Sequence, residues 1–200
     1  EIFDRQLLRH RRARAATTLS RHDFLHRLVA ETLLERLADI KLPLARLLCL
    51  GFPDGGLAQQ LRADPRTELV VTNAGCDGAA QEKHQVVMLD EEALPFAPRS
   101  FDGIVSNLSL HLTNDLPGVL RQCHDILAPQ GAFLATALGG ATLQELRHCL
   151  THAELKLFGG VSPRIAPALS AESATALMQR AGFNAPVVDS ERLTVVYPDM

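Results

Sequence analysis

Short apolar runs alternate with segments of helical periodicity from residue 45 onward, and this alternation restricts the fold more than any other feature. The runs that we expect to be strands are 45–51, 68–73, 85–89, 101–106 and 131–138. The expected helices are 56–62, 115–127, 142–157 and 171–181. Strands that are apolar on both faces belong to parallel sheets covered by helices. The sequence therefore predicts an α/β fold, a three-layer doubly wound and mostly parallel sheet, with two further strand candidates at 183–189 and 193–197.

A sheet of this kind binds its ligands beyond the carboxyl ends of the strands, where the strand order reverses. The segment after the first expected strand has glycines at 51, 55 and 56. Their spacing differs from the dinucleotide fingerprint, and no Gly-Lys-Ser/Thr follows as in a phosphate loop. Two interpretations remain open: a turn that lets the backbone approach a ligand, and a plain tight turn.

An arginine-rich segment and an amphipathic helix precede the alternation. Residues 1–22 contain six arginines against Glu1 and Asp4. A transit peptide has such a composition, but we favour a basic helix that packs on the body of the protein. Apolar residues then recur every four positions from Leu25 to Leu37, which predicts a helix that Asp23 caps and Pro43 ends.

The composition excludes several classes of protein. A chain of 200 residues with 46% hydrophobic residues is long enough for one domain with a real core. The net charge of −3 excludes a globally basic nucleic-acid binder, and no run reaches the roughly 18 apolar residues of a membrane span. Three of the four cysteines lie in apolar or helical patterns rather than in a disulfide framework, which favours a reducing compartment.

The order of motifs from residue 90 to 131 is more specific. It consists of Asp-Glu-Glu-Ala-Leu-Pro-Phe at 90–96, Ser-Asn-Leu-Ser-Leu-His at 106–111 and Ile-Leu-Ala-Pro-Gln-Gly at 126–131. With these motifs the chain resembles class I S-adenosylmethionine-dependent methyltransferases. It is most similar to one branch, the methyltransferase-like assembly factors of respiratory complex I and their alphaproteobacterial relatives. The segments that carry the branch resemblance are 2–5, 139–147, 159–163 and 180–183. Malonyl-carrier-protein methyltransferases of biotin synthesis form a cousin branch.

The resemblance implies a Rossmann-like domain over 1–200, with an N-terminal helical extension (1–40), a cofactor-binding core (44–138) and a substrate or lid side (139–200). The final antiparallel strand of the family is not apparent in this sequence.

The resemblance also implies the ligands and partners. The cofactor would be S-adenosylmethionine, and the partner would be a protein substrate or an assembly partner, with no nucleic acid and no metal. The expected location is the bacterial cytoplasm, with the mitochondrial matrix as the alternative. The oligomeric state is not indicated. The residues implied in cofactor binding are Gly51, Phe52, Gly55, Asn73, Asp90, Glu91 and Asn107.

Three positions of the implied cofactor site depart from the family pattern. Cys49 replaces an acid, Pro53 replaces a glycine, and Asn73 replaces the acid that holds the ribose hydroxyls. Asparagine still offers a donor and an acceptor, but it lacks charge-assisted bonds. Three hypotheses follow: an enzyme that modifies a protein and binds its cofactor weakly, a non-catalytic scaffold with a decayed cofactor site, and a small-molecule or carrier-protein methyltransferase.

Several side chains have two interpretations. His111 and Asn107 are the candidate catalytic residues, but His111 serves equally well as a structural histidine bonded to its turn. In the acidic run we expect Asp90 alone to turn inward, with Glu91 and Glu92 in solvent or facing a basic protein. The segment 159–168 is a lid or a surface loop, and its Arg164 would hold a carboxylate or a partner. We expect Asp102 to pair with a neighbouring backbone or basic group.

Overall fold

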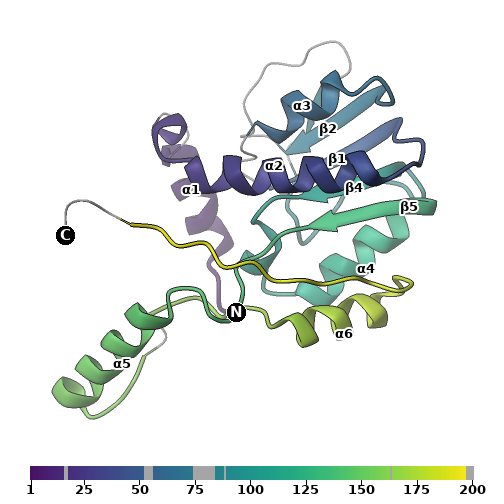
Figure 1. Cartoon of the computed structure of the whole chain (residues 1–200). Coiled ribbons are helices and arrows are strands. Elements are labelled where there is room, and N and C mark those ends of the chain that lie inside the picture. Colours follow the sequence, from purple (N-terminus) through teal and green to yellow (C-terminus); the bar gives the residue numbers. More distant parts are fainter. Residues whose placement is uncertain (16–17, 52–55, 74–83, 88, 163, 197–200) are drawn as a thin grey trace. The chain divides into compact units, whose positions relative to one another are not determined.

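The computed structural model describes the chain except for residues 16–17, 52–55, 74–83, 88, 163 and 197–200. The chain forms two compact units, Glu1–Leu138 and Gly139–Met200. The boundary between them lies where the sequence places the end of the cofactor-binding core. Figure 1 shows both units.

The first unit is an α/β sheet with helices packed on it (Figure 1). Its five strands have the order β3-β2-β1-β4-β5 and all pair in parallel, which confirms the expected fold class. The strand order reverses between β1 and β4. The helices and turns are α1 (Arg5–Ala15), η1 (Leu19–Arg21), α2 (Phe24–Asp39), α3 (Leu57–Ala63), η2 (Leu110–Leu112) and α4 (Leu116–Ile126). The strands are β1 (Arg46–Leu50), β2 (Leu69–Asn73), β3 (His84–Val87), β4 (Phe101–Ser106) and β5 (Leu127–Ala135).

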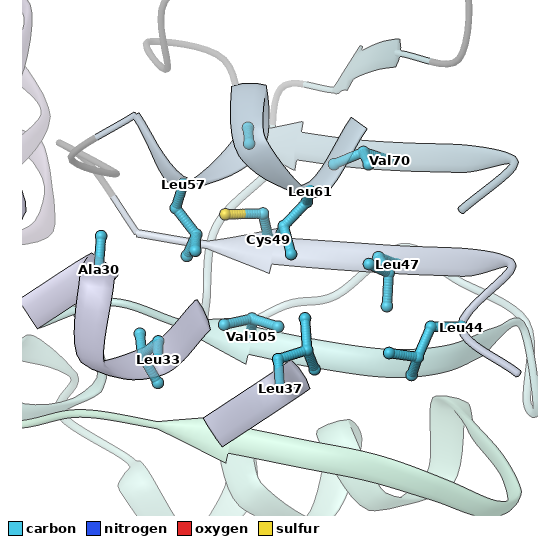
Figure 2. Close-up of a cluster of buried hydrophobic side chains, with 11 residues drawn as sticks. Ala30, Leu33, Leu37, Leu44, Leu47, Cys49, Leu57, Leu61, Val70 and Val105 are labelled. Atoms are coloured by element: carbon cyan, nitrogen blue, oxygen red, sulfur yellow. The ribbon is translucent and has the colours of Figure 1, made fainter. Parts of the chain in front are cut away.

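The core of this unit forms because β1 is apolar on both faces. Residues 47–50 of the strand are completely buried. Figure 2 shows one side, where α2 and α3 pack on the sheet. The side chains of this cluster are Ala30, Leu33, Leu37, Leu44, Leu47, Cys49, Leu57, Ala58, Leu61, Val70 and Val105. The thiol of Cys49 is therefore part of the core rather than of a ligand site.

Some element boundaries differ from the expectation. The helix α2 ends at Asp39, because Ile40 already adopts an extended backbone, well before Pro43. Asp23 does precede this helix, but its carboxylate accepts from Arg27 Nε at 2.9 Å and makes no capping bond. The strand β5 starts at Leu127, which pairs with Phe101, and an irregularity in register follows.

The second unit contains the helices α5 (Gln144–Phe158) and α6 (Ala171–Ala181). Ser170 caps α6 by accepting from the Ser173 amide at 3.2 Å. The strand predictions at 183–189 and 193–197 are wrong for the residues described, which lie in no strand. Strand propensity reflects the fit of a side chain to a sheet surface, and no described strand pairs with these residues. No described helix has the length and apolar character needed to cross a membrane.

Candidate functional site

The carboxyl ends of β1 and β4 lie side by side at the point where the strand order reverses. The Asn107 amide donates to the Leu50 carbonyl at 3.1 Å. Gly51 has a φ of +115°, and a Cβ built there would lie 2.7 Å from the Asn107 carbonyl oxygen. A side chain at position 51 is therefore excluded by both backbone conformation and space. The close approach of two strand ends explains Gly51 without a ligand, and it leaves the ends of β1 and β4 at the edge where ligands bind in such sheets.

Asn107 holds this edge together. Its side chain is fully buried. Its amide nitrogen donates to the His26 carbonyl at 2.9 Å, and its oxygen accepts from the Thr136 hydroxyl at 3.3 Å. The residue thus connects α2 to the segments that follow β4 and β5. In this structure the Asn107 side chain serves the architecture of the site and is not exposed to a ligand.

The acidic run after β3 is arranged differently from the expectation. Glu91 is the buried member, with a side chain only 2% exposed, whereas the Asp90 side chain is 27% exposed. The prediction that Asp90 alone turns inward is wrong. Glu92 is also engaged, since its carboxylate accepts from the Asn114 amide.

Glu91 is buried because two arginines from α1 reach it. Arg5 Nη2 lies 2.6 Å from Oε2, Arg12 Nη1 lies 2.7 Å from Oε1, and the Ser109 hydroxyl donates to Oε1 at 3.1 Å. Burial alone would raise the pKa of Glu91, but the charge and hydrogen bond of Arg12, together with Arg5, outweigh it and hold the pKa below its usual value. The carboxylate is therefore ionised and fully paired.

Asp90 shares this network. Its Oδ1 accepts from Arg5 Nη2 and from the Glu92 amide, and Arg9 lies 3.6 Å from Oδ2. Burial alone would raise the pKa of Asp90, but the hydrogen bond from Arg5 outweighs it and lowers the pKa. In Figure 1, α1 lies beyond the end of the sheet toward which the strand arrows point.

Hydrogen bonds also hold the residues that precede α1 against the rest of the unit. The Asn114 side-chain oxygen accepts from the amides of Ile2 and Phe3, each at 2.8 Å, and its nitrogen donates to the Phe3 carbonyl at 3.0 Å. Of the two interpretations of the basic N-terminal segment, the structure bears out a helix that packs on the body. We call residues 1–15 the N-terminal arm.

His111 lies in η2, after the carboxyl end of β4. Its Nδ1 is buried and has no hydrogen-bond partner among the described residues. Burial lowers its pKa to about 4, and the nearby His26 and Arg12 contribute in the same direction. The imidazole is therefore neutral at physiological pH and retains a nitrogen that is able to accept or donate a hydrogen bond.

Other predicted residues lie elsewhere or outside the description. Phe52, Pro53 and Gly55 are outside the described residues, and Asn73 ends β2 with a side chain that is not described. Asp102 is at the opposite edge of the sheet. There it accepts from the Arg46 amide at 2.9 Å and pairs with the Arg46 guanidinium, so the expectation of a structural role is confirmed.

The sequence analysis did not identify the arginines of α1 as site residues. Arg5 and Arg12 are seven positions apart, with Leu8 between them, so they lie on one helix face. This spacing could have identified Arg5 and Arg12 as a pair. However, residues 1–22 contain six arginines, and the sequence alone does not distinguish these two from the others.

The described residues fit the adenine end of S-adenosylmethionine. An adenine amine is a neutral donor, and Asp90 has a partly exposed carboxylate as an acceptor. Its Oδ1 accepts from Arg5 and the Glu92 amide, whereas its Oδ2 lies 3.6 Å from Arg9, beyond hydrogen-bond distance. The residues that would face the ribose and methionine groups fall at positions that the structure does not describe.

Comparisons with known proteins identify the family of the chain. Residues 48–135 match a family described as a methyltransferase domain. The whole chain is 36% identical to the mitochondrial arginine-hydroxylase NDUFAF5 of Danio rerio and 39% identical to that of Homo sapiens, and it spans 64% and 60% of their lengths. It is 31% identical to the malonyl-[acyl-carrier protein] O-methyltransferase of Gallionella capsiferriformans, over the whole chain and 72% of that relative.

Solved structures show the same fold. The possible histamine N-methyltransferase of Thermotoga maritima is 19% identical with a TM-score of 0.58, over 86% of this chain and 79% of that one. A putative methyltransferase from Bacillus halodurans is 16% identical with a TM-score of 0.57, over 76% and 68%. The sheet order, the matched motifs and these relatives together show that the chain belongs to the class I S-adenosylmethionine-dependent methyltransferase superfamily, among the relatives of the NDUFAF5 arginine-hydroxylases and the malonyl-[acyl-carrier protein] O-methyltransferases.

Proposed function

We propose that this chain binds S-adenosylmethionine at the carboxyl edge of its sheet and modifies a protein substrate during assembly of respiratory complex I. The observation that carries the cofactor part is the reversal of strand order between β1 and β4, together with the partly exposed carboxylate of Asp90 in the segment that follows β3. Ligands of doubly wound sheets bind at this place. The similarity of the whole chain to the arginine-hydroxylases supports the protein substrate.

Each residue has a distinct part in this proposal. Asp90 would accept from the adenine amine, and Gly51 would let the ends of β1 and β4 come together at the edge where the ligand binds. When bound, S-adenosylmethionine supplies a methyl group already activated on a sulfonium, so the protein mainly needs to bind and orient the reactants. His111 would contact the acceptor through the accessible part of its uncharged ring, because its Nδ1 is buried.

A titration of the protein with S-adenosylmethionine and S-adenosylhomocysteine tests the cofactor part. Asp90→Asn removes the charge, and Asp102→Asn is the matched control, because Asp102 is also paired with an arginine and is similarly exposed, at 22%, but lies at the opposite edge. We expect saturable binding that Asp90→Asn weakens about 10- to 100-fold, the value of one charge-assisted bond. Absence of binding by folded protein would refute the cofactor part and favour the scaffold hypothesis.

The acceptor needs a separate assay. Purified complex I subunits of the matching organism are incubated with the protein and S-adenosylmethionine, and mass spectrometry identifies any modified arginine and whether it carries a methyl group. A carrier-bound short diacid serves as the second acceptor, because the malonyl-[acyl-carrier protein] O-methyltransferase is similar over 72% of its length. Methylation of the carrier-bound acid alone would replace the protein-substrate proposal. We place the protein in the bacterial cytoplasm or the mitochondrial matrix, and fractionation of the source cells tests this.

A further inference from the structure

One face of α5 in the second unit is opposed by the loop that follows the helix. Arg147, Leu150, Thr151 and Glu154 recur at helical spacing and therefore lie on one face. Described residues of the loop lie along this face and, together with the helix, border a half-open cavity of about 190 Å³. The residues that complete its lining are Val161, Ser162, Arg164 and Ile165.

Glu154 fastens the loop to the helix. Its side chain is only 8% exposed. Its carboxylate accepts from the Ser162 amide at 2.8 Å, from the Ser162 hydroxyl at 2.6 Å and from Arg164 Nε at 2.6 Å. The Ser162 bonds, followed by Arg164, lower the pKa of Glu154 to about 2, so it stays ionised at physiological pH. These hydrogen bonds hold Ser162 and Arg164 of the loop against α5 on one side of the cavity.

The charges around the cavity do not balance. Glu154 neutralises Arg164. Arg147 donates only to the backbone carbonyls of Gly140 at 3.3 Å and Thr142 at 3.4 Å, and no described carboxylate pairs with it. Arg164 uses Nε for Glu154, and its two terminal nitrogens have no partner among the described residues. The cavity is therefore lined by the guanidinium of Arg147, which has no described carboxylate partner, and by that of Arg164, whose two terminal nitrogens have no described partner.

We propose that this cavity binds a small carboxylate. A guanidinium fork matches the two oxygens of a carboxylate, and a second cation strengthens the attraction. Leu150 and Ile165 offer apolar surface for a short aliphatic body. A volume of about 190 Å³ is below the ~300 Å³ at which drug-sized ligands begin, so the ligand is the size of one side chain. A free short-chain acid and the glutamate side chain of a partner share this chemistry. The proposal does not depend on cofactor binding.

Nuclear magnetic resonance titration of the full chain with glutarate tests the proposal, and a short peptide with one central glutamate forms the second arm. We expect saturable shifts confined to residues 147–165, weakened about tenfold or more by Arg147→Gln and by Arg164→Gln. Arg180→Gln is the control, since Arg180 is exposed on α6 of the same unit and does not line the cavity. The uncharged analogue glutaramide is expected to cause no shifts.

Arg147→Gln is the decisive variant, because Arg147 takes no part in the contacts of Glu154 and its loss leaves the loop fastened. Tighter binding of glutarate identifies a free acid as the ligand, and tighter binding of the peptide identifies an acidic side chain. Three results would overturn the proposal: no saturation by either probe in folded protein, equal binding of glutaramide, or unchanged affinity in Arg147→Gln.

Discussion

Replacing Glu91 by glutamine removes the charge at the centre of the network that holds the N-terminal arm, while keeping the size of the side chain. The carboxylate accepts from Arg5 at 2.6 Å, from Arg12 at 2.7 Å and from Ser109 at 3.1 Å. Glutamine keeps one acceptor oxygen, and its amide nitrogen then faces a guanidinium that also donates. One arginine loses its bond, and the other keeps a weaker, uncharged acceptor.

The size of the effect follows from burial. Breaking a fully buried ion pair costs about 3–5 kcal/mol. Arg5 and Arg12 are 17% and 18% exposed, so water partly replaces the lost partner and the cost is smaller than for a fully buried pair. We expect a loss of about 2–4 kcal/mol in the free energy of unfolding. For a chain of this size that lowers the melting temperature by about 5–15 °C.

The pH dependence has a definite sign. The pKa of Glu91 is 4.5 in its ordinary state and lower in the fold, so its ionisation stabilises the fold above about pH 4.5. This contribution is lost as the pH falls through the lowered folded value. The difference in unfolding free energy between the wild type and Glu91→Gln is therefore expected to have its full value at pH 7 and to decrease below about pH 4.5.

Urea denaturation at several pH values measures this difference. Glu35→Gln is the control, because Glu35 is exposed on α2 and surface changes of this kind stay within about 0.5 kcal/mol. Hydrogen exchange of the α1 amides gives a local measure and is expected to speed up in Glu91→Gln alone. An unfolding free energy within about 0.5 kcal/mol of the wild type at pH 7 would refute the reasoning.

Three further predictions concern the carboxyl edge of the sheet. Asn107→Ala removes the bonds to His26 and Thr136 and is expected to lower the unfolding free energy by about 1–3 kcal/mol, measured by urea denaturation. Gly51→Ala forces a Cβ to within 2.7 Å of a carbonyl oxygen at positive φ, and the same assay is expected to show a loss of at least about 2 kcal/mol. The His111 ring is expected to titrate near pH 4 by nuclear magnetic resonance, and a midpoint above pH 6 would contradict its burial.

The sheet was predictable because its signal is local. The apolar run of β1 is sufficient for a buried parallel strand, and the alternation with helices determines the class. The strand candidates at the C-terminal end failed for the opposite reason. Val187 and Val196 have strand propensity, but a strand also needs a neighbour, which propensity does not supply.

The candidate site was predictable only in part, because its electrostatics are not local. Three adjacent acids at 90–92 have the pattern of a solvated loop. The burial of Glu91 depends on Arg5 and Arg12, which are 86 and 79 positions earlier in the chain. The family resemblance identified Asp90 and Gly51 as site residues, but no family motif indicates which arginine reaches which acid.

The same network makes the N-terminal arm part of the candidate site. Arg5 donates to Asp90 and to Glu91 at once, so the arm and the residue proposed to hold the adenine amine share one cation. An arginine on one oxygen of Asp90 lowers the cost of removing that carboxylate from water, but it also weakens the carboxylate as an acceptor for a neutral amine. Cys49 belongs to the core and Asn73 is uncharged, so neither supplies a carboxylate at this edge. In the proposed site, Arg5 would therefore determine both how well Asp90 is held in place and how strongly it accepts from the adenine amine, so the N-terminal arm would belong to that site.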